Sequence, residues 1–160
     1  MSKALGLVWL MVMTAMSPAL GAELTAERVH EILAATSPER PADLSGKSLE
    51  NLDLSNFDFR RANLSRANLF GAKLVGADFS RANLSDAKLD LAWIMRANFT
   101  DTNLSNASLL GLVVASGLDY SPAEAPTFRG ANFSGAHILA RLGRFDLSGH
   151  SQDQGREKHG

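Results

Sequence analysis

A Leu, Phe, Ile or Val residue recurs at every fifth position through the middle of this 160-residue chain. The row begins at Leu44 and reaches Val114 without a gap, and alanine often stands two residues before its members. Five residues turn a straight α-helix by about 140° and carry a straight β-strand to its opposite face, so neither element can keep this row on one side. The chain must therefore bend once in every five residues.

Each five-residue unit combines a short extended part with a bend. The small residue and the large one are two positions apart and point the same way, whereas the Asp, Asn, Lys or Ser between them points outward. The last two positions hold pairs such as Ser-Gly and Ser-Arg, which favour turns. The large residues predicted to point into the core are Leu44, Leu49, Leu54, Phe59, Leu64, Leu69, Leu74, Phe79, Leu84, Leu89, Ile94, Phe99, Leu104, Leu109, Val114, Phe128, Phe133 and Ile138.

Five of the units resemble the repeats of the pentapeptide-repeat family: ADLSG (42–46), ANLSR (62–66), ANLFG (67–71), ADFSR (77–81) and ANLSD (82–86). The resemblance implies an all-β solenoid, a right-handed quadrilateral β-helix with about 20 residues per coil and alanines beside the stacked large residues. The bending follows from the period, whereas the four-sided shape follows from the resemblance. We place the repeat domain at residues 41–149.

The first 22 residues have the features of a secretory signal peptide. Lys3 lies near the amino terminus, an apolar run covers 4–13, and Ser17 precedes a proline and several small residues. A membrane-spanning helix needs roughly 20 apolar residues, and this run is shorter. We expect cleavage that removes residues 1–22 and a periplasmic or secreted mature protein.

Residues 23–40 are predicted to form a helix and a linker that cap the first coil. Thr25 is suited to the N-cap position, and Leu24 and Val29 have the spacing of a hydrophobic staple. A loose amphipathic lead-in is the alternative.

The five-residue register is lost after Val114 and regained at Phe128, so residues 115–127 are predicted to form a loop inserted on the side of the rod. Such a loop can carry a function, and an insertion without a role is the alternative. The polar residues 150–160 are predicted to form a disordered tail. We expect the last coil to be uncovered, and an open sheet edge can pair with another chain.

Several apolar residues occupy positions that should face outward, on two adjoining sides of the rod. Exposed apolar patches of this kind mark covered surfaces or binding surfaces. We expect that either the 115–127 loop covers them or they contact a partner protein or a second copy. The predicted patch contains Phe70, Val75, Leu91, Trp93, Met95, Leu110 and Val113.

The residue types needed for catalysis or metal binding are missing or dispersed. The chain has no cysteine, its four histidines have no metal-ligand spacing, and its carboxylates occur singly. We therefore expect no catalytic, cofactor-binding or metal-binding residues and no enzyme activity. The 16 basic and 17 acidic residues give a net charge of −1, so no nucleic-acid partner is expected.

These features predict a non-catalytic, exported module with a structural or protein-binding role, and the family resemblance implies a bacterial source and hence the periplasm. No stable membrane span is expected after signal cleavage. The resemblance also implies an alternative, because some cytoplasmic members of the family imitate duplex DNA and bind gyrase through an acidic rod that dimerises by a C-terminal helix. This chain departs from them in its leader, its mixed surface charge and its tail, so a DNA-mimic binder of a gyrase-like enzyme is the alternative only if the protein is cytoplasmic.

Overall fold

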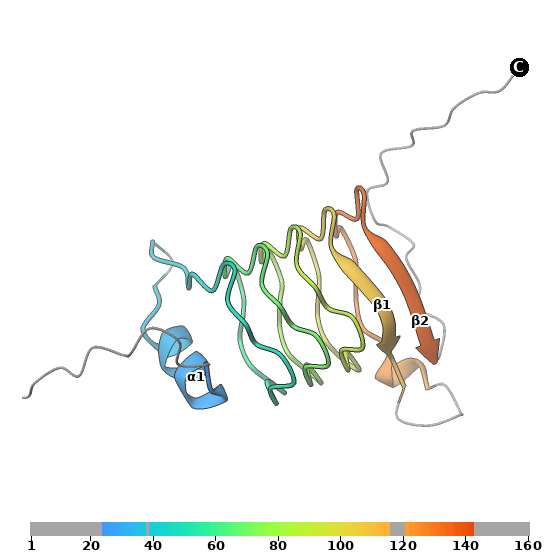
Figure 1. The fold of residues 1–160 in the computed structure, drawn as a ribbon, viewed down its shortest axis with the longest axis horizontal. Helices are drawn as coiled ribbons and strands as arrows, with labels where there is room; N and C mark the ends of the chain where they lie inside the picture. Colours follow the sequence, from blue (N-terminus) through green and yellow to red (C-terminus); the bar gives the residue numbers. More distant parts are fainter. Residues whose placement is uncertain (1–23, 38, 116–120, 143–160) are drawn as a thin grey trace, which may run out of the picture.

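The computed structural model describes residues 24–37, 39–115 and 121–142, and in it the chain winds into a rod of stacked coils (Figure 1). Parallel bridges join each coil to the next. Asp43 and Asn63 form one such bridge and are 20 residues apart in sequence, so one coil contains 20 residues. Four rows of bridges run along the rod. The chain therefore forms the expected right-handed quadrilateral β-helix, with one five-residue unit on each side of a coil.

The four sides are numbered in the order in which the chain meets them, and each is defined by its row of bridged residues. Side one contains Asp43, Asn63, Asn83, Asn103 and Asn132; side two contains Ser48, Asn68, Lys88, Ser108 and His137; side three contains Asp53, Lys73, Trp93 and Val113; side four contains Asp58, Asp78, Asn98 and Thr127.

A residue with left-handed backbone geometry forms each corner between sides. Gly71 has φ 65° at one corner and Arg61 has φ 62° at another. This conformation costs a non-glycine residue about 1 kcal/mol, and hydrogen bonds at the corner offset the cost. The Arg61 N–H donates to the Ser80 carbonyl of the next coil at 3.1 Å, and the Ala62 N–H closes the turn on the Phe59 carbonyl at 3.0 Å.

The large residue of each unit points inward and stacks on its counterpart in the next coil. The rings of Phe59, Phe79 and Phe99 are nearly parallel, with centroids 4.7 and 5.0 Å apart, and Phe128 continues the stack at 4.9 Å. Of the predicted core residues, Ile138 is half-buried and the others are buried. The core is therefore a set of side-chain columns, in which each member is covered by the coils before and after it.

Helix α1 (Ala26–Ala34) covers the N-terminal end of the rod (Figure 1). Oγ1 of Thr25 accepts a hydrogen bond from the Arg28 N–H at 3.3 Å, which makes Thr25 the N-cap that the sequence predicts. Val29 is fully buried in the core. The capping helix is thus held by the apolar face of the first coil.

Strands β1 (Ser108–Val113) and β2 (His137–Leu142) pair in parallel near the C-terminal end of the rod. In this part of the rod, bridged residues are further apart in sequence than in a normal coil. Asn103 and Asn132, for example, are 29 residues apart. The additional residues form the insertion that the lost register predicts.

The insertion returns to the coil through the 3-10 helix η1 (Pro122–Glu124). The Arg96 N–H donates to the Glu124 carbonyl at 2.8 Å, and Thr127 bridges Asn98 on side four. Thr127 is therefore part of the coil rather than of the loop.

The signal peptide predicted at 1–22 and the tail predicted at 150–160 lie outside the described residues. Among the residues that the structure describes, there is no candidate for a membrane-spanning helix.

A lysine placed at a core position should unfold the rod, whereas the same residue one position later should not. Leu84 is fully buried, so Leu84→Lys should lower the free energy of unfolding by several kcal/mol. Ser85 is half-buried and lies on the outward row, so Ser85→Lys should change it by about 0.5 kcal/mol or less. Circular dichroism during thermal unfolding measures both variants. Equal losses of β signal would contradict the inward and outward assignment of the two positions.

Candidate functional site

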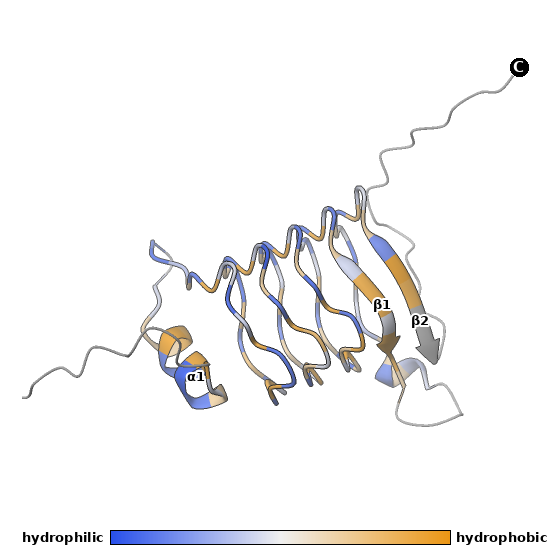
Figure 2. Cartoon of the chain, in the orientation of Figure 1, coloured by the Kyte–Doolittle hydropathy of each residue, from blue (hydrophilic) through white to orange (hydrophobic). Residues whose placement is uncertain are grey.

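Four large apolar side chains are exposed at the corner between sides two and three, in the C-terminal half of the rod. The exposed fractions are 36% for Leu91, 43% for Trp93, 43% for Leu110 and 64% for Leu139. Figure 2 shows hydrophobic residues within β1 and β2, the strands that carry Leu110 and Leu139. These four residues are called the apolar edge below.

Backbone pairing between successive coils brings the residues of the apolar edge together. The Leu91 N–H donates to the Leu110 carbonyl at 2.8 Å, and Leu110 is the bridge partner of Leu139 in β2. Trp93 lies two residues after Leu91 and is bridged to Val113 at the end of β1. The apolar edge is therefore a continuous surface on three neighbouring coils.

The carboxylate of Asp90 fixes the start of β1 beside the apolar edge. Its Oδ1 accepts hydrogen bonds from the Ser108 hydroxyl at 2.6 Å and from the Leu110 N–H at 2.8 Å. These bonds restrict the backbone that carries Leu110. Both backbone groups of Leu110 are thus hydrogen-bonded, the N–H to Asp90 and the carbonyl to the Leu91 N–H.

Three other residues of the predicted patch are half-buried: Phe70, Val75 and Val113. The ammonium group of Lys88 lies 5.1 Å from the centroid of the Phe70 ring, in a cation–π arrangement. Phe70 therefore contacts Lys88 within the protein and is less exposed than the sequence predicts.

Met95 was expected to face outward, and this expectation is wrong because the side chain is only 7% exposed. The residues on either side of Met95 are bonded to the segments that precede and follow the insertion. The Ile94 N–H donates to the Val113 carbonyl at 2.9 Å, and the Arg96 N–H donates to the Glu124 carbonyl at 2.8 Å. The segment that returns from the insertion thus lies beside Met95, whereas Trp93 stays exposed.

Leu139 is part of the apolar edge although the sequence reasoning did not include it. It directly follows Ile138, which was assigned to the core, and it is in the same outward row as Leu110. Counting one residue beyond each core position would have identified it.

The polar side chains of side one form hydrogen bonds with one another along the rod. On side one, an amide of each coil donates to the side chain of the coil before it: Asn63 to Asp43 at 3.1 Å, Asn83 to Asn63 at 3.3 Å, Asn103 to Asn83 at 3.1 Å and Asn132 to Asn103 at 3.3 Å. This ladder uses the hydrogen-bonding capacity of the row within the protein. Side one therefore has a structural role.

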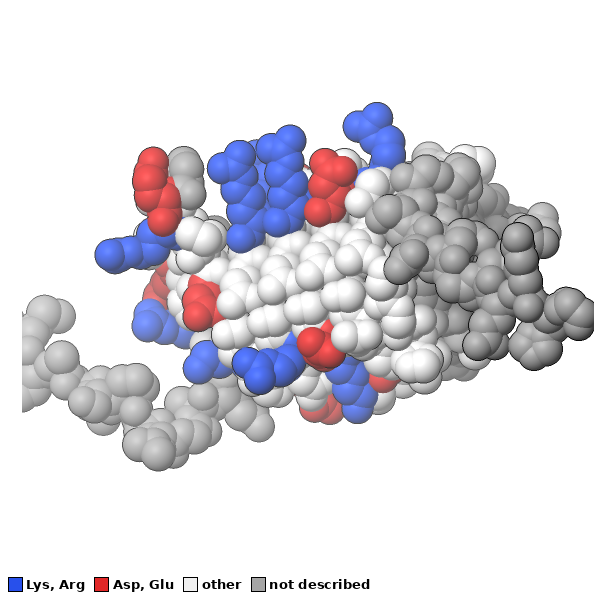
Figure 3. All heavy atoms as spheres, turned by 90° about the horizontal axis from the view of Figure 1, so that it is seen from above, with Lys and Arg blue, Asp and Glu red and all other residues white. Residues whose placement is uncertain are grey.

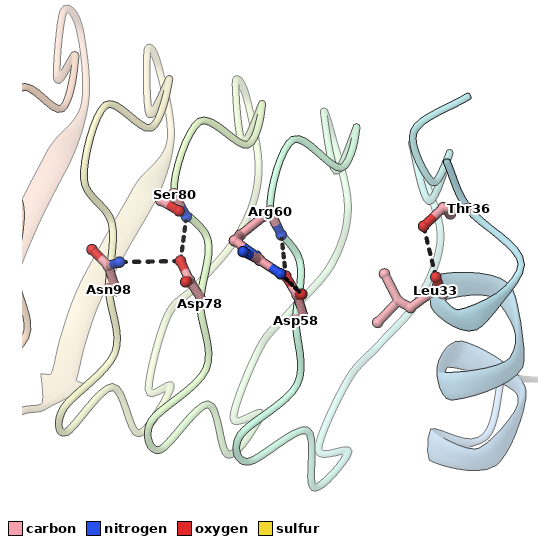
Figure 4. A network of polar contacts seen from close by, with 7 residues as sticks. All are labelled: Leu33, Thr36, Asp58, Arg60, Asp78, Ser80 and Asn98. Atoms are coloured by element: carbon pink, nitrogen blue, oxygen red, sulfur yellow. Dashed lines mark hydrogen bonds and ion pairs between the residues drawn. The ribbon is translucent and has the colours of Figure 1, made fainter. Parts of the chain in front are cut away.

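Side four carries a polar network close to α1 (Figure 4). Oδ1 of Asp58 accepts from the Arg60 Nε at 2.8 Å and from the Arg60 backbone N–H at 3.0 Å. Oδ1 of Asp78 accepts from the Ser80 N–H at 2.9 Å and from the Asn98 amide at 3.1 Å. The hydrogen bonds from the Arg60 side chain hold the pKa of Asp58 below its usual range.

The described residues contain no group of three His, Asp or Glu side chains that could hold a metal ion. His30 is in α1 and His137 is in β2, so they lie near opposite ends of the rod (Figure 1). His150 and His159 are outside the described residues.

The family model described as "Pentapeptide repeats" matches this chain in eight copies, over residues 42–69 and 62–101. No curated protein matches the sequence.

Three solved structures illustrate what the chain is similar to. A pentapeptide-repeat protein of the Arabidopsis thaliana thylakoid lumen is 34% identical, over 61% of this chain and 68% of that one, with a TM-score of 0.31. A pentapeptide-repeat protein of Nostoc PCC 7120 is 27% identical, over 79% and 93% of the two chains, with a TM-score of 0.34. QnrB1, a plasmid-mediated fluoroquinolone resistance protein, is 21% identical, over 74% and 69%, with a TM-score of 0.39.

Removing the Arg60 side chain should raise the pKa of Asp58 toward its ordinary value near 3.8. A lowered pKa means that the interaction stabilises the fold above the ordinary pKa and is lost as the pH falls through the folded-state pKa. NMR titration of the Asp58 carboxyl carbon in wild type and Arg60→Ala measures the shift. Arg66→Ala, at the corner between sides one and two, is the control and should leave the midpoint unchanged. An identical midpoint in wild type and Arg60→Ala would show that the ion pair does not set the pKa.

Proposed function

Because this chain belongs to the pentapeptide-repeat family, we propose that it is an exported, non-catalytic module whose β-helical rod binds another protein. The observation that carries the proposal is the apolar edge. Its four side chains lie on three neighbouring coils and are 36 to 64% exposed. Tryptophan is enriched among the residues that contribute most to protein interfaces, and the buried core of an interface is more apolar than its rim.

The geometry of the rod supports a binding role over a structural one for this edge. A purely structural coil needs only polar or small residues at outward positions, as the asparagine ladder of side one illustrates. Leucine and tryptophan at such positions expose apolar area to water, which is unfavourable unless another molecule covers it. A covering protein would remove that area from water.

The sequence of residues 1–22 supports export to the periplasm or beyond the cell. A charged start, a short apolar run and small residues before the expected cleavage point are the features of a secretory signal. Export would place the apolar edge among extracytoplasmic partners.

The charge distribution gives little support to the alternative of a DNA-mimic binder. Between positions 42 and 115 the chain has eight acidic and eight basic residues. Figure 3 shows basic and acidic side chains side by side on one face of the rod. A surface that imitates the DNA backbone needs a continuous negative charge, which this mixture lacks.

Replacing Trp93 and Leu110 together by serine should abolish partner binding and leave the rod folded, because both side chains are about half-exposed. A tryptophan at the centre of an interface contributes about 2 kcal/mol or more, so affinity should fall by more than about tenfold. The measurement is affinity capture from periplasmic extract, with light scattering to determine the mass of the purified protein. The double variant Ser85→Ala and Ser105→Ala, on side one, is the matched control.

A captured protein that is retained by the control and lost by the Trp93 and Leu110 variant would support the proposal. A dimer that the same variant dissociates would identify a second copy as the partner. A monomeric protein whose captured proteins are the same in all three forms would refute the role of the apolar edge.

Export predicts that the mature protein begins near Glu23. Mass spectrometry of the protein purified from the periplasmic fraction should give the mass of residues 23–160. Leu10→Arg interrupts the apolar run and should leave the full chain in the cytoplasm. An unprocessed wild-type chain found in the cytoplasm would refute export and favour the DNA-mimic alternative.

A further inference from the structure

A cleft of about 730 Å³ opens between α1 and side four, beside the corner where side four meets side one. Leu33 contributes to its helix wall, and Phe57, Arg61 and Arg81 contribute to its coil wall. Figure 4 looks into this region, with Leu33 on one side and the polar row of side four on the other. The volume is within the range of small-molecule sites.

Two arginines at the cleft lack a charged partner among the described residues. Arg61 and Arg81 occupy equivalent corners of successive coils, with φ values of 62° and 61°. Their side chains therefore leave the rod at the same edge, about 4.8 Å apart at the backbone. The neighbouring Arg60 differs, because its charge is paired with Asp58. The cleft thus carries a net positive charge at this corner.

The next residue in the corner row does not neutralise this pair. Asp101 follows Arg81 by one coil, and its carboxylate lies beside Gly130 of the following coil, where it would collide with a β-carbon on that glycine. The carboxylate is therefore directed away from Arg81. Two like charges at neighbouring positions repel each other, and a bound anion would relieve the repulsion.

An apolar wall lies in the opposite part of the cleft, beside the polar residues Ser55, Asn56 and Thr36. Phe57 occupies the position that Ala77 occupies one coil later, and it packs against the core beside α1. The ring of His30 meets the Phe57 ring edge-on, with centroids 5.8 Å apart. Leu33 and Ala34 complete this wall. A ligand in the cleft would meet cations at one end and apolar surface at the other.

We infer that this cleft binds a small organic phosphate, with the phosphate group between Arg61 and Arg81 and an apolar group against Phe57 and Leu33. Two guanidinium groups from successive coils can donate to several oxygens of one tetrahedral phosphate, whereas a single arginine already satisfies a planar carboxylate. The hydroxyl of Ser80, which also lines the cleft, can add a donor. The cleft lies diagonally across the rod from the apolar edge, so this inference is independent of the proposed protein partner.

Phenyl phosphate is a suitable probe, because it joins a phosphate to an apolar ring. NMR titration of the mature chain with phenyl phosphate to about 10 mM should show saturable shifts of backbone amides at Phe57, Arg61 and Arg81. The variant Arg61→Gln with Arg81→Gln should bind at least about tenfold more weakly. The matched control is Arg66→Gln with Arg96→Gln, which removes the same charge from corner residues with the same left-handed geometry and should retain binding.

Two comparison ligands test whether binding needs both the phosphate group and the ring. Benzoate and inorganic phosphate should each bind more weakly than phenyl phosphate, because one lacks the tetrahedral group and the other lacks the ring. The inference is overturned if no saturable shifts occur, if both double variants lose affinity equally, or if benzoate binds as tightly as phenyl phosphate. Binding to vesicles that contain phosphatidic acid, without binding to phenyl phosphate, would also overturn it, in favour of a lipid surface.

Discussion

The hydrogen bonds between successive coils are the interaction on which the other features of this rod depend. No coil can satisfy all of its own backbone: the corners close on internal bonds such as Ala62 N–H to the Phe59 carbonyl, but the other N–H and carbonyl groups on a side need the coil before or after it. Bonds such as Leu84 N–H to Asn103 carbonyl at 2.7 Å fix neighbouring coils in register. Because register is fixed, residues far apart in sequence form straight rows, and both the apolar edge and the pair of cleft arginines are such rows.

Much of this fold could be predicted because a five-residue period leaves few physical solutions. The inward row, the Thr25 cap and the interrupted register all follow from local sequence. The burial of Met95 could not be predicted, since it depends on where the chain re-enters after the insertion. The cleft could not be predicted either: the sequence predicts that residues 23–40 cap the first coil, but no pattern in it specifies where α1 leaves a cleft beside side four.

The two candidate surfaces arise where the chain departs from its own repeat. Leu91 stands at a corner where the preceding coil has Gly71, and Phe57 stands where the next coil has Ala77. A repeat only needs small and polar residues at such positions to stack. Larger residues at these positions add nothing to the pairing of coils. They instead give this rod surfaces that the regular repeat lacks.

The phenylalanine stack continues across the insertion without a change of spacing. Phe79 and Phe99 are 5.0 Å apart between centroids, and Phe99 and Phe128 are 4.9 Å apart although additional residues separate them in the chain. The rod therefore keeps its rise per coil regardless of what leaves the coil between Ala115 and Thr127. This point is a natural attachment site, at which a peptide or a small domain could be grafted, lengthened or exchanged while the rod serves as a rigid spacer.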